Sequence, residues 1–316
     1  MSTPLHDSPL AALNARLSRR ERAAISILLE MRFLSTAQLE RWVFDGATPL
    51  ARARASRRGV AKLVELGLVR HLERRIGGVR AGSAGHINVL TALGLRLAAA
   101  HGWITPEQAH RTREPGTQFV QHHLAVAEAH LRVLEARARG ELELLARQAE
   151  PAAWREFTAP GGGQVTLKPD ACFTIGPKSR PTTWLLEVDR ATVGGSTLER
   201  KLSVYVDFSR SVDFSRSDQA TGARAAAAKV LWLVPDRRRL DQLQQAFGRT
   251  PAAARPLFRA AIFDQLIAVL ANAKAPAHGQ RQPGRMPARD SVAARPARMP
   301  EREPVASSEV ASREAV

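Results

Sequence analysis

The chain has 316 residues, 44% of them hydrophobic, which is enough for two domains with cores of their own plus extensions. Its 47 Lys and Arg residues against 30 Asp and Glu give a net charge of +17, which favours nucleic acid as a partner over an acidic membrane surface. There is no apolar run of about 18 residues, no signal-peptide pattern, and a single cysteine, Cys172, so membrane-spanning and disulfide-rich secreted classes are disfavoured. We therefore expect a cytoplasmic protein.

The first hundred residues predict three short helices followed by a β-hairpin. Capping boxes, in which two side chains close the first turn reciprocally, start the first two helices: Ser18 with Glu21, and Ser35 with Gln38. Thr48 and Pro49 start the third, Pro49–Leu66, and Gly67 is placed to end it. Strands at 68–72 and 86–90 and a helix at 92–100 complete a predicted winged helix-turn-helix over residues 18–101, after a flexible lead-in, 1–17.

The third predicted helix is basic along one side. It contains five basic residues and one acid, and 100° per residue gathers four of the basic side chains opposite an apolar face. Residues 1–115 hold 18 Lys and Arg against 9 Asp and Glu, which favours DNA over a protein-binding winged helix with a solvated basic face. We expect DNA contacts from this helix and from the hairpin, through Arg52, Arg54, Arg57, Arg58, Lys62, Arg74, Arg75 and Arg80.

After a polar linker, 102–116, the pattern changes to alternating helices and strands. His122 and His123 in the long helix 117–139 are adjacent and face different directions, so they are poor partners for one metal ion. Period-two alternation predicts one strand over Val165–Ile175, with Val165, Leu167, Ala171, Phe173 and Ile175 on one face. The other predicted elements are strands at 142–147, 184–189 and 229–234, and helices at 197–208, 240–247 and 257–273.

Carboxylates mark the ends of two neighbouring predicted strands. Glu187 and Asp189 are two residues apart and share a face, and Asp170 on the preceding strand is placed to meet them. Three acids at a strand end suit Mg²⁺ or Mn²⁺, with Glu128 as a further candidate ligand. A purely structural cluster is the alternative that spacing alone favours, with its acids satisfied by backbone groups, Arg190, Arg200 or Lys201.

The order helix, three strands, helix, strand, with Pro169-Asp170 and Glu187 on successive strands, resembles the PD-(D/E)XK nuclease-like superfamily. The resemblance implies an αβββαβ domain over 117–272 around a central mixed sheet, with Asp170 and Glu187 on the metal. Asp189 occupies the position of the motif lysine, and Lys201 is the candidate replacement. The candidate catalytic set is thus Asp170, Glu187, Asp189 and Lys201, and the missing lysine argues against catalysis because no cation there stabilises the developing phosphoryl charge.

The chain up to about residue 272 also resembles the bacterial replication-relaxation family. The matching motifs, in order, are Phe33–Leu39, Leu63–Val69, Val89–Gly94, His122–Glu128, Leu167–Ala171, Leu186–Arg190, and Lys201 with Tyr205. The resemblance implies a winged-helix protein that binds double-stranded DNA in plasmid or mobile-element replication or mobilisation, with a nuclease-like domain that we expect to be inactive.

Other functions and partners stay open at this point. A metal-dependent endonuclease or nickase, a scaffold that recruits replication or transfer proteins, and a transcriptional regulator are the alternative functions. A homodimer and a replication or mobilisation protein are further expected partners, and a membrane is not.

Two segments carry little functional signal. Val206–Ser211 is repeated at once as Val212–Ser217, which indicates a small tandem duplication in a loop or helix end. Residues 273–316 are rich in Pro and Arg and lack aromatic residues, so they predict a disordered tail.

Overall fold

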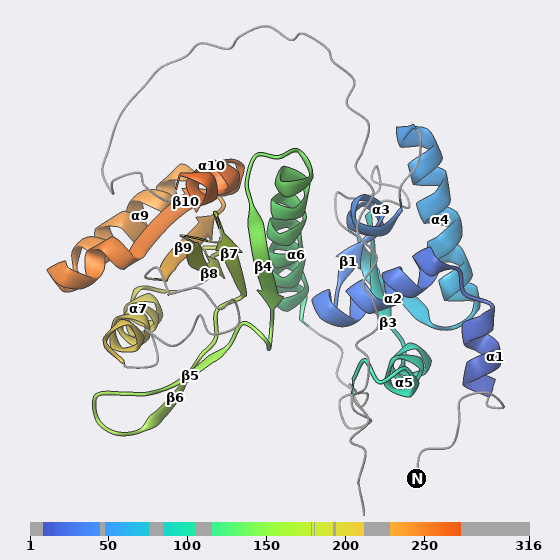
Figure 1. The fold of residues 1–316 in the computed structure, drawn as a ribbon, viewed down its shortest axis with the longest axis horizontal. Helices are drawn as coiled ribbons and strands as arrows, with labels where there is room; N and C mark the ends of the chain where they lie inside the picture. Colours follow the sequence, from blue (N-terminus) through green and yellow to red (C-terminus); the bar gives the residue numbers. More distant parts are fainter. Residues whose placement is uncertain are drawn as a thin grey trace, which may run out of the picture. The chain divides into compact units, whose positions relative to one another are not determined.

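A computed structural model describes residues 9–44, 48–75, 85–104, 116–177, 179, 181–191, 194–211 and 228–272. The N-terminal elements are α1 (Pro9–Ala15), α2 (Arg19–Met31), β1 (Leu34–Ser35), α3 (Thr36–Val43), α4 (Pro49–Glu65), β2 (Val69–Arg75), β3 (His86–Leu90) and α5 (Ala92–Ala100). The predicted order of helices, hairpin and closing helix is confirmed (Figure 1). The short helix α1 forms within 1–17, where no helix was predicted.

The predicted helix starts are confirmed as well. Both capping boxes form: the Ser35 hydroxyl accepts the N–H of Gln38 at 3.1 Å and the Gln38 side chain accepts the N–H of Ser35 at 3.1 Å. Ser18 and Glu21 make the same reciprocal pair at the start of α2. Gly67 follows α4 with a φ of 69°, a left-handed conformation that glycine adopts without strain.

Close backbone packing holds these helices together. A Cβ on Gly59 of α4 would lie 2.6 Å from the Phe44 ring that follows α3, and a Cβ on Gly94 of α5 would lie 2.2 Å from the carbonyl oxygen of Leu68. Glycine at both sites therefore allows approaches that a larger residue would block. The strands form a three-stranded sheet in the order β1-β3-β2.

The remaining elements build an α/β part. They are α6 (Thr117–Ala138), β4 (Leu144–Ala149), β5 (Arg155–Thr158), β6 (Gln164–Leu167), β7 (Ala171–Ile175), β8 (Thr182–Val188), α7 (Gly195–Arg210), β9 (Lys229–Val234), α9 (Arg237–Gly248), the 3₁₀ helix η5 (Ala252–Leu257), β10 (Phe258–Ile262), the 3₁₀ helix η6 (Phe263–Gln265) and α10 (Leu266–Ala271). The first copy of the duplicated hexapeptide lies at the end of α7, and the second lies outside the described residues.

A five-stranded mixed sheet forms the centre of this part (Figure 1). Its order is β10-β9-β8-β7-β4, with β10, β9 and β8 parallel and with β8, β7 and β4 successively antiparallel. The elements α6, β4, β7, β8, α7 and β9 follow the predicted αβββαβ order. Helices α6 and α10 pack on the face that carries Trp184 and Leu186, and α7 and α9 pack on the face that carries Leu185.

The prediction of one strand over Val165–Ile175 is wrong. Pro169 has no N–H to donate to a sheet, and the chain divides there into β6, which pairs with β5 in a separate hairpin, and β7, which enters the main sheet. Leu167 consequently packs in the core on the α7 side, whereas Phe173 packs in the core under α6.

The predicted helix over 257–273 is also wrong. Alanine-rich sequence favours helix, but Phe258–Ile262 forms β10, which pairs in parallel with β9 along the edge of the sheet. The helix α10 begins only at Leu266. Tertiary pairing with a neighbouring strand thus overrides the local helix propensity of this segment.

Direct contacts join α2 and α3 to α6 and β4. The Arg41 guanidinium donates to the carboxylates of Glu128 and Glu135, with closest distances of 2.8 Å to each, and Arg147 of β4 donates to Glu30 at 2.6 Å. The described residues accordingly belong to one compact unit, Met1–His278.

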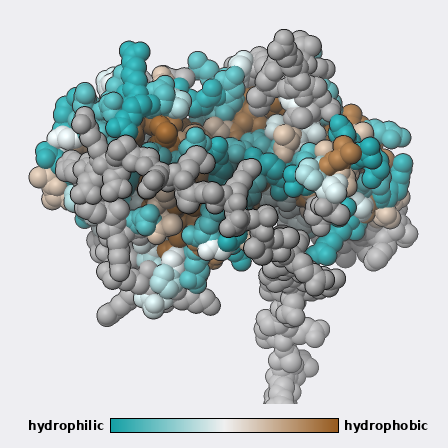
Figure 2. Space-filling view, turned by 90° about the horizontal axis from the view of Figure 1, so that it is seen from above, coloured by the Kyte–Doolittle hydropathy of each residue, from teal (hydrophilic) through white to brown (hydrophobic). Residues whose placement is uncertain are grey.

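The surface and the remaining segments complete the description. Figure 2 shows a face on which hydrophilic residues predominate and hydrophobic ones occur in small groups. No described helix has the length and apolar character needed to cross a membrane. The predictions for residues 105–115 and for the tail 273–316 lie outside the described residues.

Candidate functional site

The predicted acids lie together at one end of the main sheet. Glu187 is near the end of β8 and Asp189 follows it, whereas Asp170 directly precedes β7. Strands β7 and β8 are antiparallel, with Ala171 opposite Leu186, so the start of one strand lies beside the end of the other. All three carboxylates are buried, with exposed fractions of 6% or less.

Glu187 ties the sheet to α7. Its Oε2 accepts from the Lys201 Nζ and its Oε1 accepts from the Tyr205 hydroxyl at 2.5 Å. Lys201 and Tyr205 are four residues apart and therefore lie on the same face of α7. The Lys201 side chain stays 40% exposed and its Nζ lies 5.5 Å from the centre of the Trp232 ring, so this ammonium borders both the buried acid and solvent.

Burial dominates the titration of this pair. Burial is the main reason that the pKa of Glu187 rises to about 7; the charge of Asp170 adds to the rise, and Lys201 and Tyr205 oppose it. Burial alone would lower the pKa of Lys201, but the negative charges of Glu187 and Asp170 outweigh it and raise that pKa. Burial and the adjacent carboxylate also raise the pKa of Tyr205, which keeps its hydroxyl a hydrogen-bond donor.

Asp170 is bonded on both oxygens. Its Oδ2 accepts the N–H of Val188 at 2.7 Å, and its Oδ1 lies 3.1 Å from Nε2 of His122 on α6. Burial lowers the pKa of His122, but the hydrogen bond to Asp170 and its charge outweigh this effect and raise the pKa above its usual value. His122 thus belongs to the site, although the sequence indicated it only as part of the family-like motif His122–Glu128 and assigned it no role.

His123 has a different environment from His122, as the adjacent positions predicted. Its ring is 8% exposed and packs against the rings of Phe33 and Phe119, with centroids 5.8 and 4.3 Å away.

Asp189 pairs with a residue that sequence reasoning missed. Its Oδ2 accepts from Arg239 of α9, at 2.7 Å from Nη2 and 3.1 Å from Nε. Its Oδ1 accepts the N–H of Ala191 at 2.6 Å, and Ala191 has a φ of 60° that this bond helps to hold. The alternative of a structural cluster expected Arg190, Arg200, Lys201 or backbone groups as partners of the acids. Lys201 does bind Glu187, and the backbone N–H of Val188 binds Asp170. The cation that binds Asp189 is Arg239 and was not expected.

Glu128 lies in a different set of contacts. Arg41 donates to it at 2.8 Å and Arg132 donates to it at 3.3 Å, so its carboxylate joins α6 to α3. Within the described ranges, no group of three or more His, Cys, Asp or Glu side chains is arranged to hold a metal ion. The Mg²⁺ or Mn²⁺ site at Asp170, Glu187 and Glu128 stays a prediction.

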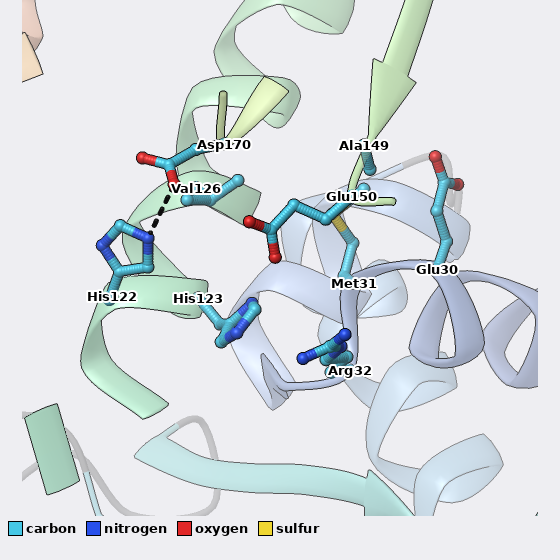
Figure 3. A pocket seen from close by; sticks show the side chains of 9 residues that line it. All are labelled: Glu30, Met31, Arg32, His122, His123, Val126, Ala149, Glu150 and Asp170. Carbon is cyan, nitrogen blue, oxygen red and sulfur yellow. Dashed lines mark hydrogen bonds and ion pairs between the residues drawn. The ribbon is translucent and has the colours of Figure 1, made fainter. Parts of the chain in front are cut away.

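A pocket opens beside Asp170. It is lined by Glu30, Met31, Arg32, His122, His123, Val126, Ala149, Glu150 and Asp170. Figure 3 shows the Glu150 carboxylate pointing into this pocket on the side of His122 and Asp170. Burial and the charge of Asp170 raise the pKa of Glu150.

The predicted DNA-contact residues divide into two groups. Arg52 and Lys62 form ion pairs inside the protein, with Glu40 at 3.1 Å and with Glu21 at 2.9 Å. Arg54, Arg57 and Arg58 are exposed on α4, and no described residue forms an ion pair with them. The side chains of Arg74 and Arg75 and the whole of Arg80 lie outside the described residues.

Comparisons with known proteins give one family. The model of the replication-relaxation family matches residues 25–222, more than half of the 316-residue chain. No curated protein matches the chain. The crystal structure of protein VC1899 from Vibrio cholerae is similar at 12% sequence identity and a TM-score of 0.30, over 86% of this chain and 56% of that one. The chain thus spans little more than half the length of that protein.

The buried Glu187 predicts a pH-dependent stability. The folded protein keeps the Glu187 proton up to a pKa of about 7, whereas an unfolded glutamate loses it near its ordinary value of 4.5. Between these values the folded state binds more protons, so the stability that this group contributes falls as pH rises. Urea unfolding of wild type and Glu187→Gln from pH 5 to pH 8 should show wild type losing roughly 1–3 kcal/mol relative to the variant.

The exposed Glu199 on the same helix supplies the control. Its side chain is 59% exposed, so Glu199→Gln makes the same change of net charge at an exposed position and measures the effect of that change alone. A difference between wild type and Glu187→Gln that does not change with pH would show that Glu187 is ionised throughout this range.

Proposed function

The chain belongs to the replication-relaxation family, and from this premise we propose that it binds double-stranded DNA in the replication or mobilisation of plasmids or other mobile elements. The proposal assigns DNA binding to the N-terminal part as a winged helix-turn-helix. The order α2, α3, α4, β2, β3, with β1 paired to β3, supports it, because a winged helix places its third helix in the major groove and its hairpin beside the backbone.

The observation that supports this proposal most is that α4 presents arginines with which no described residue forms an ion pair. Arg54, Arg57 and Arg58 are exposed, and no described carboxylate forms an ion pair with them. Arg52 and Lys62, one on each side along the helix, are both paired with glutamates of α3 and α2. A row of unpaired guanidinium groups on an exposed helix suits a phosphate backbone, and arginine also pairs bidentately with guanine in the major groove.

The ion pairs of Arg52 and Lys62 reduce the number of α4 side chains that are expected to contact DNA. Lys62 donates to the Arg16 carbonyl at 2.7 Å and to Glu21 at 2.9 Å, so moving it to a phosphate would leave the 7%-exposed Glu21 carboxylate without its cation. We therefore assign Lys62 and Arg52 to holding α4 against α2 and α3. DNA contact then falls to the exposed arginines.

Replacing these arginines should weaken DNA binding and its salt dependence together. The Arg54→Ala, Arg57→Ala, Arg58→Ala triple variant should lose at least about tenfold in affinity for duplex DNA near 100 mM salt, because up to three counterion-releasing contacts disappear. The slope of log affinity against log salt should fall in magnitude by roughly 2 to 3. Fluorescence anisotropy over a salt series measures both quantities.

A triple variant with the same charge change provides the control. Arg137, Arg210 and Arg238 are exposed on α6, α7 and α9, and replacing them by alanine should change the slope far less. If both triple variants lost DNA affinity and salt slope equally, the net charge alone would explain the loss. That result would contradict a binding surface on α4.

For the α/β part we propose a nuclease-like domain that does not cleave DNA. The contacts of its acids support this reading: Glu187 is held by Lys201 and Tyr205, and Asp189 by Arg239, so each acid already has its cation. If Asp189 bound a divalent ion in place of Arg239, the Arg239 side chain would lose its counter-charge. That side chain is only 11% exposed, so the loss would be costly. Metal-dependent cleavage is the competing function, favoured by the contact of the half-exposed Lys201 with Glu187 beside Asp170.

A plasmid-nicking assay separates the two. Wild-type protein with supercoiled plasmid and Mg²⁺ or Mn²⁺ should produce no more nicked circle than Asp170→Asn and Glu187→Gln, which preserve the shape of the site. Nicking by wild type that both variants lose, with DNA affinity unchanged, would establish the nuclease instead. Nicking that persists in both variants would come from a contaminant.

A further inference from the structure

Leu50 is an apolar side chain exposed on the most basic helix. It is 57% exposed at the first turn of α4, one turn before Arg54. The other large hydrophobic side chains exposed in the described ranges have ring partners: Trp103 stacks on His101 at 4.9 Å, and Phe119 packs against His123 at 4.3 Å. Within the described ranges, Leu50 belongs to no hydrophobic cluster, so its side chain faces solvent beside the arginines of α4.

The exposed face of α4 is graded along its length. At 100° per residue, Leu50 and the exposed side chains from Arg54 onward fall within an arc about 100° wide, whereas the exposed Pro49 and Ala51 of the first turn lie outside it. From the N-terminus this arc presents Leu50, Arg54, Arg57, Arg58, Ala61 and Glu65. The opposite face, with Ser56, Val60 and Leu63, is buried against the rest of the N-terminal part. The arc thus begins apolar, continues cationic and small, and ends in an acid.

This gradient fixes which half of the helix approaches DNA. Glu65 would be repelled by phosphates, whereas the first turns carry the arginines and the positive end of the helix dipole. Leu50 and Arg58 are eight residue steps apart, or about 12 Å at 1.5 Å per step, which matches roughly three to four base pairs. The N-terminal half of α4 is therefore the part that fits a major groove.

We infer that Leu50 is a specificity residue that packs against the C5-methyl group of a thymine in the major groove. This inference rests on the proposed DNA binding. The thymine methyl is the apolar group that base edges offer there, and a leucine beside three arginines can meet it while they bind phosphates or guanine. The unpaired charges around Leu50 favour this occupant over an apolar protein surface, which would bury those charges without partners.

Replacing thymine by deoxyuridine removes only the methyl group and so tests the contact directly. The full chain is first used to select its binding site from a random duplex library. Each thymine of that site is then replaced in turn by deoxyuridine, and affinities are measured for wild type, Leu50→Ala and Leu50→Met at one salt concentration. At one or two positions, deoxyuridine should weaken wild type about threefold to fivefold, the value of one buried methyl group.

The two Leu50 variants show whether the effect of deoxyuridine depends on the Leu50 side chain. Leu50→Ala should lose the response at those positions and keep the wild-type salt slope, whereas Leu50→Met, which keeps an apolar chain of similar length, should retain most of it. Because Leu50 is exposed, unchanged thermal unfolding of both variants checks their folding. Thymines elsewhere in the site serve as internal controls, since their replacement should affect wild type and Leu50→Ala equally.

Three outcomes would overturn the inference. Deoxyuridine could have no effect at any position, or its effect could be the same in wild type and Leu50→Ala. Alternatively, Leu50→Ala could change the sedimentation of the free protein, which would assign Leu50 to a contact with a second copy. Failure of wild type to bind any duplex would instead contradict the proposed function itself.

Discussion

A carboxylate buried at the end of a sheet requires a donor for each of its oxygens, and this requirement organises the α/β part. Glu187 is 1% exposed, and Lys201 and Tyr205 satisfy it from one face of α7. The same requirement brings α9 to the sheet through Asp189 and Arg239, and α6 through Asp170 and His122. Three helices are thus positioned on the sheet by polar contacts as well as by their apolar faces.

Charge pairing also separates the cations that hold the fold from those left for a partner. Arg41, Arg147 and Lys62 form ion pairs within the protein. The amino-acid composition alone would assign their charges to a basic surface. The exposed arginines of α4 remain after this internal pairing, so the net charge of +17 overstates the basic surface that is open to the proposed DNA partner. A polyanion is therefore expected to contact the short basic stretch of α4 from Arg54 to Arg58. The basic residues on either side of it, Arg52 and Lys62, are already paired with Glu40 and Glu21.

Local patterns were sufficient to predict the helix starts and the shared face of Glu187 and Asp189, because capping and strand alternation depend on residues a few positions apart. The partners of those acids were harder to predict. Arg239 lies fifty residues after Asp189 and His122 lies 48 residues before Asp170, and only the packing of helices on the sheet brings them together. The helix predicted over β10 was wrong for the same reason. Pairing with β9 outweighed the helix preference of this alanine-rich segment.

We propose that α4 is the DNA-binding surface, and arginine-specific chemical modification with mass-spectrometric mapping can test this assignment residue by residue. Phenylglyoxal modifies exposed guanidinium groups, so the reactivity of each arginine can be compared with and without duplex DNA. We predict that DNA protects Arg54, Arg57 and Arg58 and leaves Arg137 and Arg210 reactive. Protection of Arg137 and Arg210, with the α4 arginines as reactive as in free protein, would contradict the account.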